Sequence, residues 1–351
     1  MAGAWMHGRH DEPLISNRSP REEDCTLPRT TAAALDFLHR NARENRWFLQ
    51  MECFDPHEPF FAPQKYRDLY PHQYDGPHFD WPPYREVRET PEQVAHCRYE
   101  YAALLSMCDA YLGKVLDAMD ELGLWDDTML IVNTDHGHML GEHDCWAKVW
   151  QPWYDELAHT PLFIWDPRSR IAGQRRRSLV QSIDHMATLA EFFGVPLTKD
   201  TLGRPLRDTI AADTPVREAG IFGLFGAQVN VTDGRYVYMR APVEANQPLF
   251  EYTLMPTGHT SWNFSVEKLQ DIRLSEPLPF SKGCRVMKIP TSRRLHPSTK
   301  RTLLFDLQSD PHQRYPLNDP AIERRMIEHL LDLMRQCQAP PEQYARLGLA
   351  I

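Results

Sequence analysis

The sequence lacks several features that would assign a protein class at once. It has no apolar run near the roughly 18 residues that a membrane-spanning helix needs, and no block of five like charges. Its net charge is −9, which disfavours nucleic acid and anionic membranes as partners. Residues 1–24 contain no apolar segment of the signal-peptide kind. We therefore expect no nucleic-acid or membrane partner. The sequence does not assign a compartment, although a cytoplasmic location is expected if Met1 is the genuine start.

Cysteine is too scattered to define a framework. The seven cysteines are odd in number and include no C-x-x-C pair. This argues against a disulfide scaffold and against a zinc site of the paired-cysteine type. The chain is otherwise of ordinary globular composition, and its 351 residues suffice for one large domain or two unequal ones.

Alternating apolar and amphipathic segments predict an α/β fold, with a mostly parallel sheet flanked by helices. The expected helices span residues 30–45, 90–123, 182–195 and 320–337. The expected strands of the sheet span residues 47–54, 128–132 and 160–167. After about residue 210 the pattern changes to antiparallel strands with a turn at Asp233-Gly234. We predict a catalytic α/β domain at 1–208 and a smaller α+β subdomain at 209–351.

The stretch NTDHGHMLGEHD (133–144) follows one of these predicted strands. Asp135 and His136 then stand at the carboxyl end of the strand, where open α/β sheets bind ligands. A sharp turn at Gly137 would aim both side chains at one ion. A carboxylate with an imidazole suits Mn²⁺ or Zn²⁺, whereas an all-oxygen set suits Ca²⁺ or Mg²⁺. Alternatively, Asp135 caps a helix and His136 caps a turn.

Two further polar residues stand in distinctive surroundings. Lys148 lies among aromatic residues, 13 positions after Asp135, and is either an anion clamp or a surface charge. His57 lies between prolines in FDPHEPF (54–60), where a positioned imidazole can act as a general acid or merely occupy a turn.

Taken in order, these motifs resemble the sulfatase family of the alkaline-phosphatase superfamily. The segments SIDHMATLAEFFGVP (182–196) and LFDLQSDPHQRYPLND (304–319) are similar to later motifs of that family. The resemblance implies that Asp135 and His136 are two of four protein ligands to a divalent metal. Ca²⁺ is the first choice, with Mn²⁺, Mg²⁺ and Zn²⁺ as alternatives. It also implies that Lys148 neutralises the transferred group and that His57 protonates the leaving oxygen.

The family's nucleophile is a formylglycine made in the motif C-x-P-S-R, and this motif is missing here. The nearest match, CTLPR (25–29), has its proline one position late and follows no paired aspartates. It also lies only about 20 residues before the predicted strand at 47–54. We therefore expect that the chain encodes neither the formylglycine nor the N-terminal third of the fold, and that Cys25, Cys53 and Cys145 are not nucleophiles.

Three functions stay open on these grounds. The first is hydrolysis of a small-molecule or carbohydrate sulfate ester. The second is hydrolysis of phosphonate monoesters or phosphodiesters, because an Asp-His pair also occurs in such enzymes. The third is an inactive fragment. Aromatic residues at 69–86 or 253–264 are candidates for a wall beside the substrate, and an uncovered sheet would favour a homo-oligomer.

Overall fold

The computed structural model describes residues 21–255, 264, 266–293 and 296–350. These residues form two compact units. Unit 1 contains residues 21–132, 138–148 and 163–170, and unit 2 contains residues 133–137, 149–162 and the described residues from 171 onward. The boundary that we predict at residue 208 follows a change in sequence pattern and stays a prediction. Most of the candidate wall at 253–264 lies outside the described residues.

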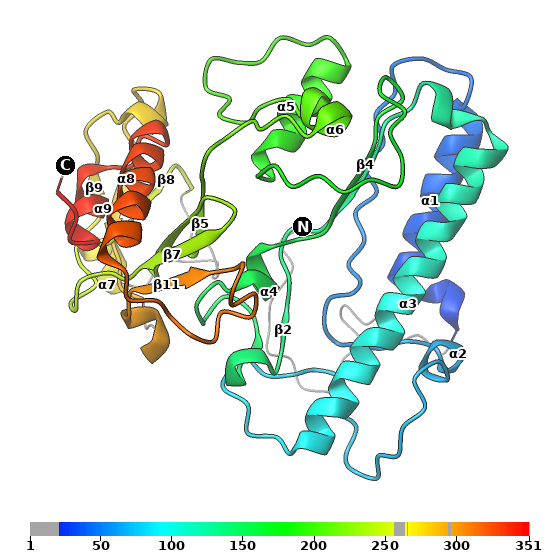
Figure 1. Ribbon diagram of the computed structural model, residues 1–351, viewed down its shortest axis with the longest axis horizontal. Helices are drawn as coiled ribbons and strands as arrows, with labels where there is room; N and C mark the ends of the chain where they lie inside the picture. The colour runs from blue at the N-terminus through cyan, green and yellow to red at the C-terminus, as the bar shows by residue number, and fades with distance from the viewer. Residues whose placement is uncertain (1–20, 256–263, 265, 294–295, 351) are drawn as a thin grey trace. The chain divides into compact units, whose positions relative to one another are not determined.

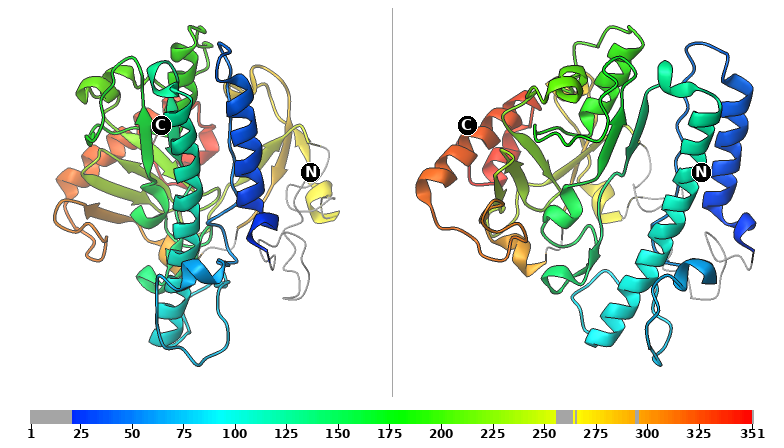
Figure 2. Two further views of the ribbon diagram at one scale, coloured as in Figure 1. Left: turned by 90° about the vertical axis from the view of Figure 1, so that its right-hand side faces the viewer. Right: turned by 45° about the vertical axis from the view of Figure 1, so that its right-hand side comes forward.

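Unit 1 is built around two helices that lie side by side, α1 and α3 (Figure 1, Figure 2). The helices of unit 1 are α1 (Thr26–Asn41), α2 (Gln64–Arg67) and α3 (Pro91–Glu121), with 3-10 turns η1 (Glu22–Asp24), η2 (Leu124–Asp126) and η3 (Glu142–Asp144). Its strands are β1 (Leu130–Asn133), β2 (Met139–Leu140), β3 (Trp146–Ala147) and β4 (Leu162–Trp165). Strand β1 pairs with β4, and β2 pairs with β3.

Local signals explain where α3 begins and ends. The Thr90 side chain accepts a hydrogen bond from the Gln93 backbone, and the Gln93 side chain accepts one from the Thr90 backbone. Pro91 takes the first helical position, where its missing N–H costs nothing. Gly123 follows the helix with a φ of 66°, a left-handed conformation that glycine adopts without strain. The predicted helix at 90–123 is therefore confirmed.

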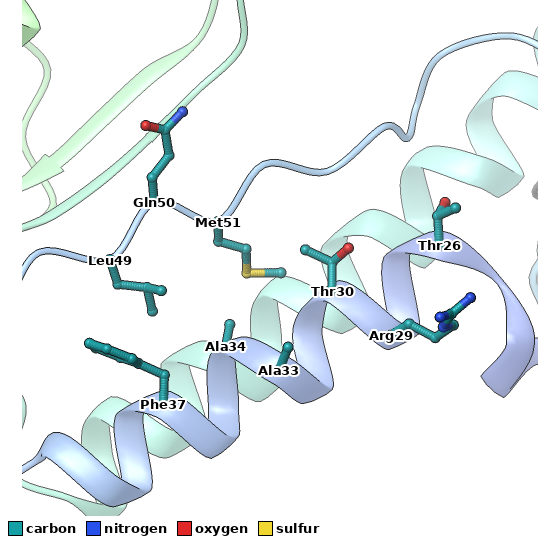
Figure 3. A pocket seen from close by; sticks show the side chains of 9 residues that line it. All are labelled: Thr26, Arg29, Thr30, Ala33, Ala34, Phe37, Leu49, Gln50 and Met51. Atoms are coloured by element: carbon teal, nitrogen blue, oxygen red, sulfur yellow. The ribbon is translucent and has the colours of Figure 1, made fainter. Parts of the chain in front are cut away.

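The segment 47–54 differs from its prediction, because it is extended but pairs with no strand among the described residues. Its side chains still alternate: Leu49 and Met51 face α1 across a groove, while Gln50 points away (Figure 3). Phe48 is 56% exposed. An apolar pattern reports how well a segment can be buried, whereas a strand also needs a partner backbone.

Unit 2 contains the antiparallel part of the chain. Its helices are α4 (Asp155–Ala158), α5 (Ile183–Phe192), α6 (Arg207–Ala212), α7 (Val266–Gln270), α8 (Pro320–Gln336) and α9 (Pro341–Arg346), with 3-10 turns η4 (Pro279–Ser281) and η5 (Pro297–Lys300). Its strands are β5 (Gly220–Gly223), β6 (Val229–Thr232), β7 (Tyr236–Arg240), β8 (Phe250–Thr253), β9 (Arg273–Leu274), β10 (Met287–Pro290) and β11 (Leu303–Asp306). They form two antiparallel sheets, in the orders β11-β7-β6-β5 and β8-β10-β9.

Helix α8 closes the larger of these sheets. Met326, Leu330 and Met334 recur at four-residue intervals, so they share one face of the helix. That face packs with Val231 and Tyr238 of the sheet in one apolar core, and α8 lies beside the sheet (Figure 1). The predicted antiparallel region and closing helix are thus confirmed. None of the described helices is both long enough and apolar enough to cross a bilayer.

Candidate active site

A short hairpin in unit 1 brings two polar side chains together. In the β2–β3 ladder, Met139 is paired with Ala147 and Leu140 with Trp146. The residues just outside this ladder, His138 and Lys148, therefore stand opposite one another. Both are close to Glu58: His138 Nε2 lies 3.3 Å from Glu58 Oε2, and Lys148 Nζ lies 3.7 Å from the same oxygen.

The proline-flanked loop 54–60 supplies the rest of this cluster. Glu58 is buried, and its Oε1 accepts a hydrogen bond of 2.5 Å from the Tyr84 hydroxyl. His57 Nδ1 lies 3.3 Å from Glu58 Oε2, and the ring stacks on Phe54 with centroids 4.4 Å apart. We call His57, Glu58, Tyr84, His138 and Lys148 the charged cluster.

The charged cluster controls the ionisation of its own carboxylate. Burial alone would raise the pKa of Glu58, but its contact with the His138 ring, 3.3 Å away, and the charge of Lys148 outweigh it. They lower the pKa of Glu58 to about 2, so the group is a carboxylate at neutral pH. In return, burial and the Glu58 hydrogen bond raise the pKa of Tyr84, which stays a neutral donor.

His57 is held as a neutral imidazole with a defined tautomer. Its Nδ1 lies 2.7 Å from the Glu58 carbonyl oxygen, which can only accept, so Nδ1 carries the proton. In the neutral ring, Nε2 then has the lone pair, so it is the nitrogen that takes up a proton and, once charged, can give it away. Burial lowers the pKa of His57, partly opposed by Glu58. The ring is consequently a better proton donor, once charged, than an exposed histidine.

Asp135 and His136 form a second polar group, within unit 2. His136 Nδ1 lies 2.9 Å from the Gly137 carbonyl oxygen, so this nitrogen donates and leaves Nε2 with its lone pair. His136 Nε2 lies 3.4 Å from Asp135 Oδ2. The Asp135 side chain is 81% exposed and also accepts a hydrogen bond from the His136 backbone.

The turn after this pair depends on close packing at Gly137. Its backbone N–H donates to the Leu157 carbonyl oxygen at 3.0 Å. A Cβ atom placed on Gly137 would lie 1.8 Å from the Glu156 carbonyl oxygen, a distance that no side chain tolerates. Glycine is therefore required where the chain passes α4, immediately after Asp135 and His136.

The Asp135–His136 pair fits part of a metal site. An imidazole lone pair and a carboxylate oxygen 3.4 Å apart have the separation that two ligands of one ion take at ordinary bond lengths. Metal-bound histidines usually donate their other ring nitrogen to a carbonyl or carboxylate, as His136 Nδ1 does here, and this bond fixes the ring's orientation. Two donors do not enclose an ion by themselves, so the pair would supply half of a coordination shell.

The cysteines near these groups are unsuited to nucleophilic attack. Cys25 is only 1% exposed and belongs to the apolar core of unit 1. Burial raises the pKa of Cys53 to about 11 and that of Cys145 to about 12, so both are thiols at neutral pH.

The sequence analysis missed three members of the charged cluster: Glu58, Tyr84 and His138. Two weak signals were present, a carboxylate between prolines and a second histidine two residues after His136. The structure brings His57 and Lys148 to one carboxylate in unit 1, and it places Asp135 and His136 side by side in unit 2.

The sequence matches the family model named Sulfatase over residues 6–195, which is more than half of the chain. Among curated proteins, it is 28% identical over 246 residues to the multifunctional alkaline phosphatase superfamily protein PehA of Trinickia caryophylli, covering 60% of this chain and 47% of the relative. It is also 28% identical over 196 residues to an arylsulfatase of Clostridium perfringens, covering 50% of this chain and 40% of the relative.

Solved structures agree on the fold. A phosphonate monoester hydrolase from Silicibacter pomeroyi superposes with a TM-score of 0.61 and 20% identity, covering 90% of this chain and 60% of that chain. The predicted α/β fold of the alkaline-phosphatase type is thereby confirmed. The chain spans about half the length, or less, of the curated relatives it matches. On the family model and these relatives together, the chain belongs to the sulfatase family of the alkaline-phosphatase superfamily.

Proposed function

We propose that this chain supplies part of the active site of a sulfate ester hydrolase. It provides the residues that act on the leaving group and half of the metal ligands. The observation that carries the proposal is the charged cluster, in which one buried carboxylate faces an ammonium and two imidazoles. Because Lys148 offsets the charge of Glu58, protonation of either imidazole makes the cluster net positive, which suits an anionic ester.

Each residue has a role that its surroundings support. Lys148 offsets charge that builds on an oxygen of the transferred group. In its imidazolium form, His57 delivers the Nε2 proton to the leaving oxygen and returns to the neutral ring, whose remaining proton stays on Nδ1 because a carbonyl holds it there. Glu58 is a positioning residue, because its side chain is buried and contacts both His57 and Lys148.

Asp135 and His136 would hold the divalent metal, with Ca²⁺ preferred and Mn²⁺, Mg²⁺ or Zn²⁺ as alternatives. When bound, such an ion offsets negative charge on the ester oxygens.

Binding of an aryl sulfate tests the proposal without needing turnover. We expect Lys148→Met to weaken binding at least about tenfold, which corresponds to about 1.4 kcal/mol. Lys114→Met is the matched control, because Lys114 is an exposed lysine of the same unit and should leave binding unchanged. Equal affinities of the two variants, measured by calorimetry, would exclude Lys148 from the site.

Turnover by this chain provides a second test. The sequence contains no C-x-P-S-R motif and offers two of four metal ligands, so we expect no hydrolysis of aryl sulfate and only weak metal binding. Hydrolysis that disappears in Cys25→Ser would instead identify CTLPR as a working nucleophile motif.

The alternative is a hydrolase of phosphonate monoesters or phosphodiesters. It is supported by the phosphonate monoester hydrolase fold and by the Asp-His pair. Both ester classes are monoanions at neutral pH, so charge does not separate them. Competition between an aryl sulfate and an aryl phosphonate monoester for the same chain does so, and tighter binding of the phosphonate would favour the alternative.

A further inference from the structure

A second set of histidines lies in unit 1, outside the charged cluster. It joins the aromatic-rich segment 69–86 to the first turns of α3. One ligand atom each from His78, His96 and Glu100 lie within 4.8 Å of one another. His72 adjoins the same place, because its Nε2 is 2.8 Å from His96 Nδ1. We call these four residues the histidine cluster.

Helix geometry explains half of the histidine cluster. His96 and Glu100 are four residues apart on α3, so their side chains share one face. Both are almost completely buried, with exposed fractions of 5% and 2%. Buried groups of this polarity need partners, and His96 Nε2 has no hydrogen-bond partner among the described residues.

Hydrogen bonds fix the tautomers of the two paired histidines. His72 Nδ1 lies 2.9 Å from the Tyr70 carbonyl oxygen, so it carries a proton. The Nε2 of a neutral His72 must then accept, which makes His96 Nδ1 the donor between the rings. His96 Nε2 is left with a bare lone pair, 3.8 Å from Glu100 Oε1. Burial and the neighbouring His72 lower the pKa of His96 to about 4, which agrees with a neutral ring.

His78 brings a second imidazole that has its own carboxylate support. Its Nε2 lies 3.0 Å from Oδ2 of the buried Asp80. When Nε2 donates to Asp80, Nδ1 keeps the lone pair. A carboxylate behind one nitrogen and a lone pair on the other is the arrangement of metal-bound histidines.

Glu100 keeps one oxygen available. Its Oε1 accepts hydrogen bonds from Arg67, at 3.1 Å from Nε and 2.7 Å from the terminal nitrogen. No hydrogen bond from the described residues reaches Oε2. The Arg67 guanidinium opposes a nearby cation, but Asp80 and Glu100 together outweigh it in charge.

We propose that His78, His96 and Glu100 bind a Zn²⁺ ion. His72 and Asp80 would orient the two imidazoles, and Arg67 would hold the Glu100 carboxylate. Two imidazoles and one carboxylate are a ligand set that zinc takes with a fourth position for water. The missing C-x-x-C motif excludes only zinc sites of the cysteine type. The 4.8 Å spread needs a small contraction on binding, which the partly exposed loop of His78 allows.

The zinc ion would fasten the segment 69–86 to α3. That segment also carries Asp80, whose carbonyl accepts from the Phe60 backbone at 2.7 Å, and Tyr84, which donates to Glu58. The ion would therefore steady a loop that supports the charged cluster without entering it. Segment 69–86 would then be held against α3 by the metal ion. Its Tyr74 already stacks on His96, with ring centroids 4.0 Å apart.

The test uses the full chain after treatment with a chelator and adds Zn²⁺ alone. Calorimetry measures the affinity and the stoichiometry of zinc binding, and thermal melting measures the change in melting temperature. We expect one tight zinc equivalent and a higher melting temperature. Co²⁺ in the same site should give the visible absorption of a four-coordinate ion. His78→Ala should weaken zinc binding by at least about 100-fold, because it removes a ligand and not merely its support.

His39→Ala is the matched control, since His39 is an exposed histidine on α1 of the same unit and should leave zinc binding unchanged. Asp135→Ala separates this site from the metal site of the proposed function and should also retain tight binding. His72→Ala should weaken binding by about 10- to 100-fold, as a positioning residue does. Equal zinc affinities of His78→Ala and the unaltered chain, or no tight binding to either, would overturn the proposal.

Discussion

At residue 58 a carboxylate is buried beside an ammonium and two imidazoles, and this burial links the site to stability. The folded-state pKa of Glu58, about 2, lies below its ordinary value of 4.5. A lowered carboxyl pKa stabilises the folded state above the unfolded pKa. The contribution is lost as the pH falls from about 4.5 towards 2.

We therefore predict that Glu58→Gln removes about 3 kcal/mol of unfolding free energy at neutral pH and flattens the loss of stability below pH 4.5. Urea unfolding at several pH values measures both effects. Asp36→Asn is the control, because Asp36 forms an exposed ion pair with Arg40 and should cost less than about 1 kcal/mol. A parallel pH dependence of Glu58→Gln and the unaltered chain would contradict the assigned charge state.

At the scale of elements, the turn behind Asp135 and His136 depends on one glycine. We predict that Gly137→Ala destabilises the chain by about 1–3 kcal/mol, because its Cβ would collide with the Glu156 carbonyl oxygen. It should also displace the Asp135–His136 pair and abolish its weak metal binding. Chemical unfolding and a metal titration measure the two effects.

Gly113→Ala serves as the opposite case. Gly113 lies inside α3, and a Cβ there meets nothing within 4 Å. Alanine should therefore stabilise the chain by up to about 1 kcal/mol through its higher helix propensity. If Gly113→Ala and Gly137→Ala changed the free energy of unfolding in the same direction, close packing at Gly137 would not be the constraint that we infer.

At the scale of the whole molecule, unit 1 presents an extended segment outside any described sheet and an exposed apolar side chain on β4. The extended segment 47–54 pairs with no described strand, and Phe163 of β4 is 68% exposed. Extended segments with free hydrogen-bonding groups and apolar side chains favour association. A second copy of the chain can supply both the missing pairing and the apolar cover.

We predict concentration-dependent self-association, which the double substitution Phe48→Ser and Phe163→Ser should reduce. Light scattering during size-exclusion chromatography measures it. Replacing exposed Tyr315 of unit 2 by serine is the control and should leave association unchanged. A monomer at every concentration tested would refute the prediction.

The sequence by itself determined the elements whose signals are local. Thr90, Pro91 and Gly123 marked the ends of α3, and the four-residue spacing of Met326, Leu330 and Met334 marked α8, because caps and helix faces depend on neighbouring residues. The order of the motifs also sufficed to indicate the family. The strand expected at 47–54 was wrong, since pairing requires a partner that a local pattern does not contain.

Only the tertiary structure decided which polar residues share a site. Glu58 meets Tyr84, His138 and Lys148 across 26 to 90 residues of chain, and nothing near Glu58 in the sequence reports these distant partners. The same holds for His96, whose tautomer depends on His72, 24 residues earlier in the chain. Burial and charge state are properties of the folded surroundings, because they depend on desolvation and on neighbours in space.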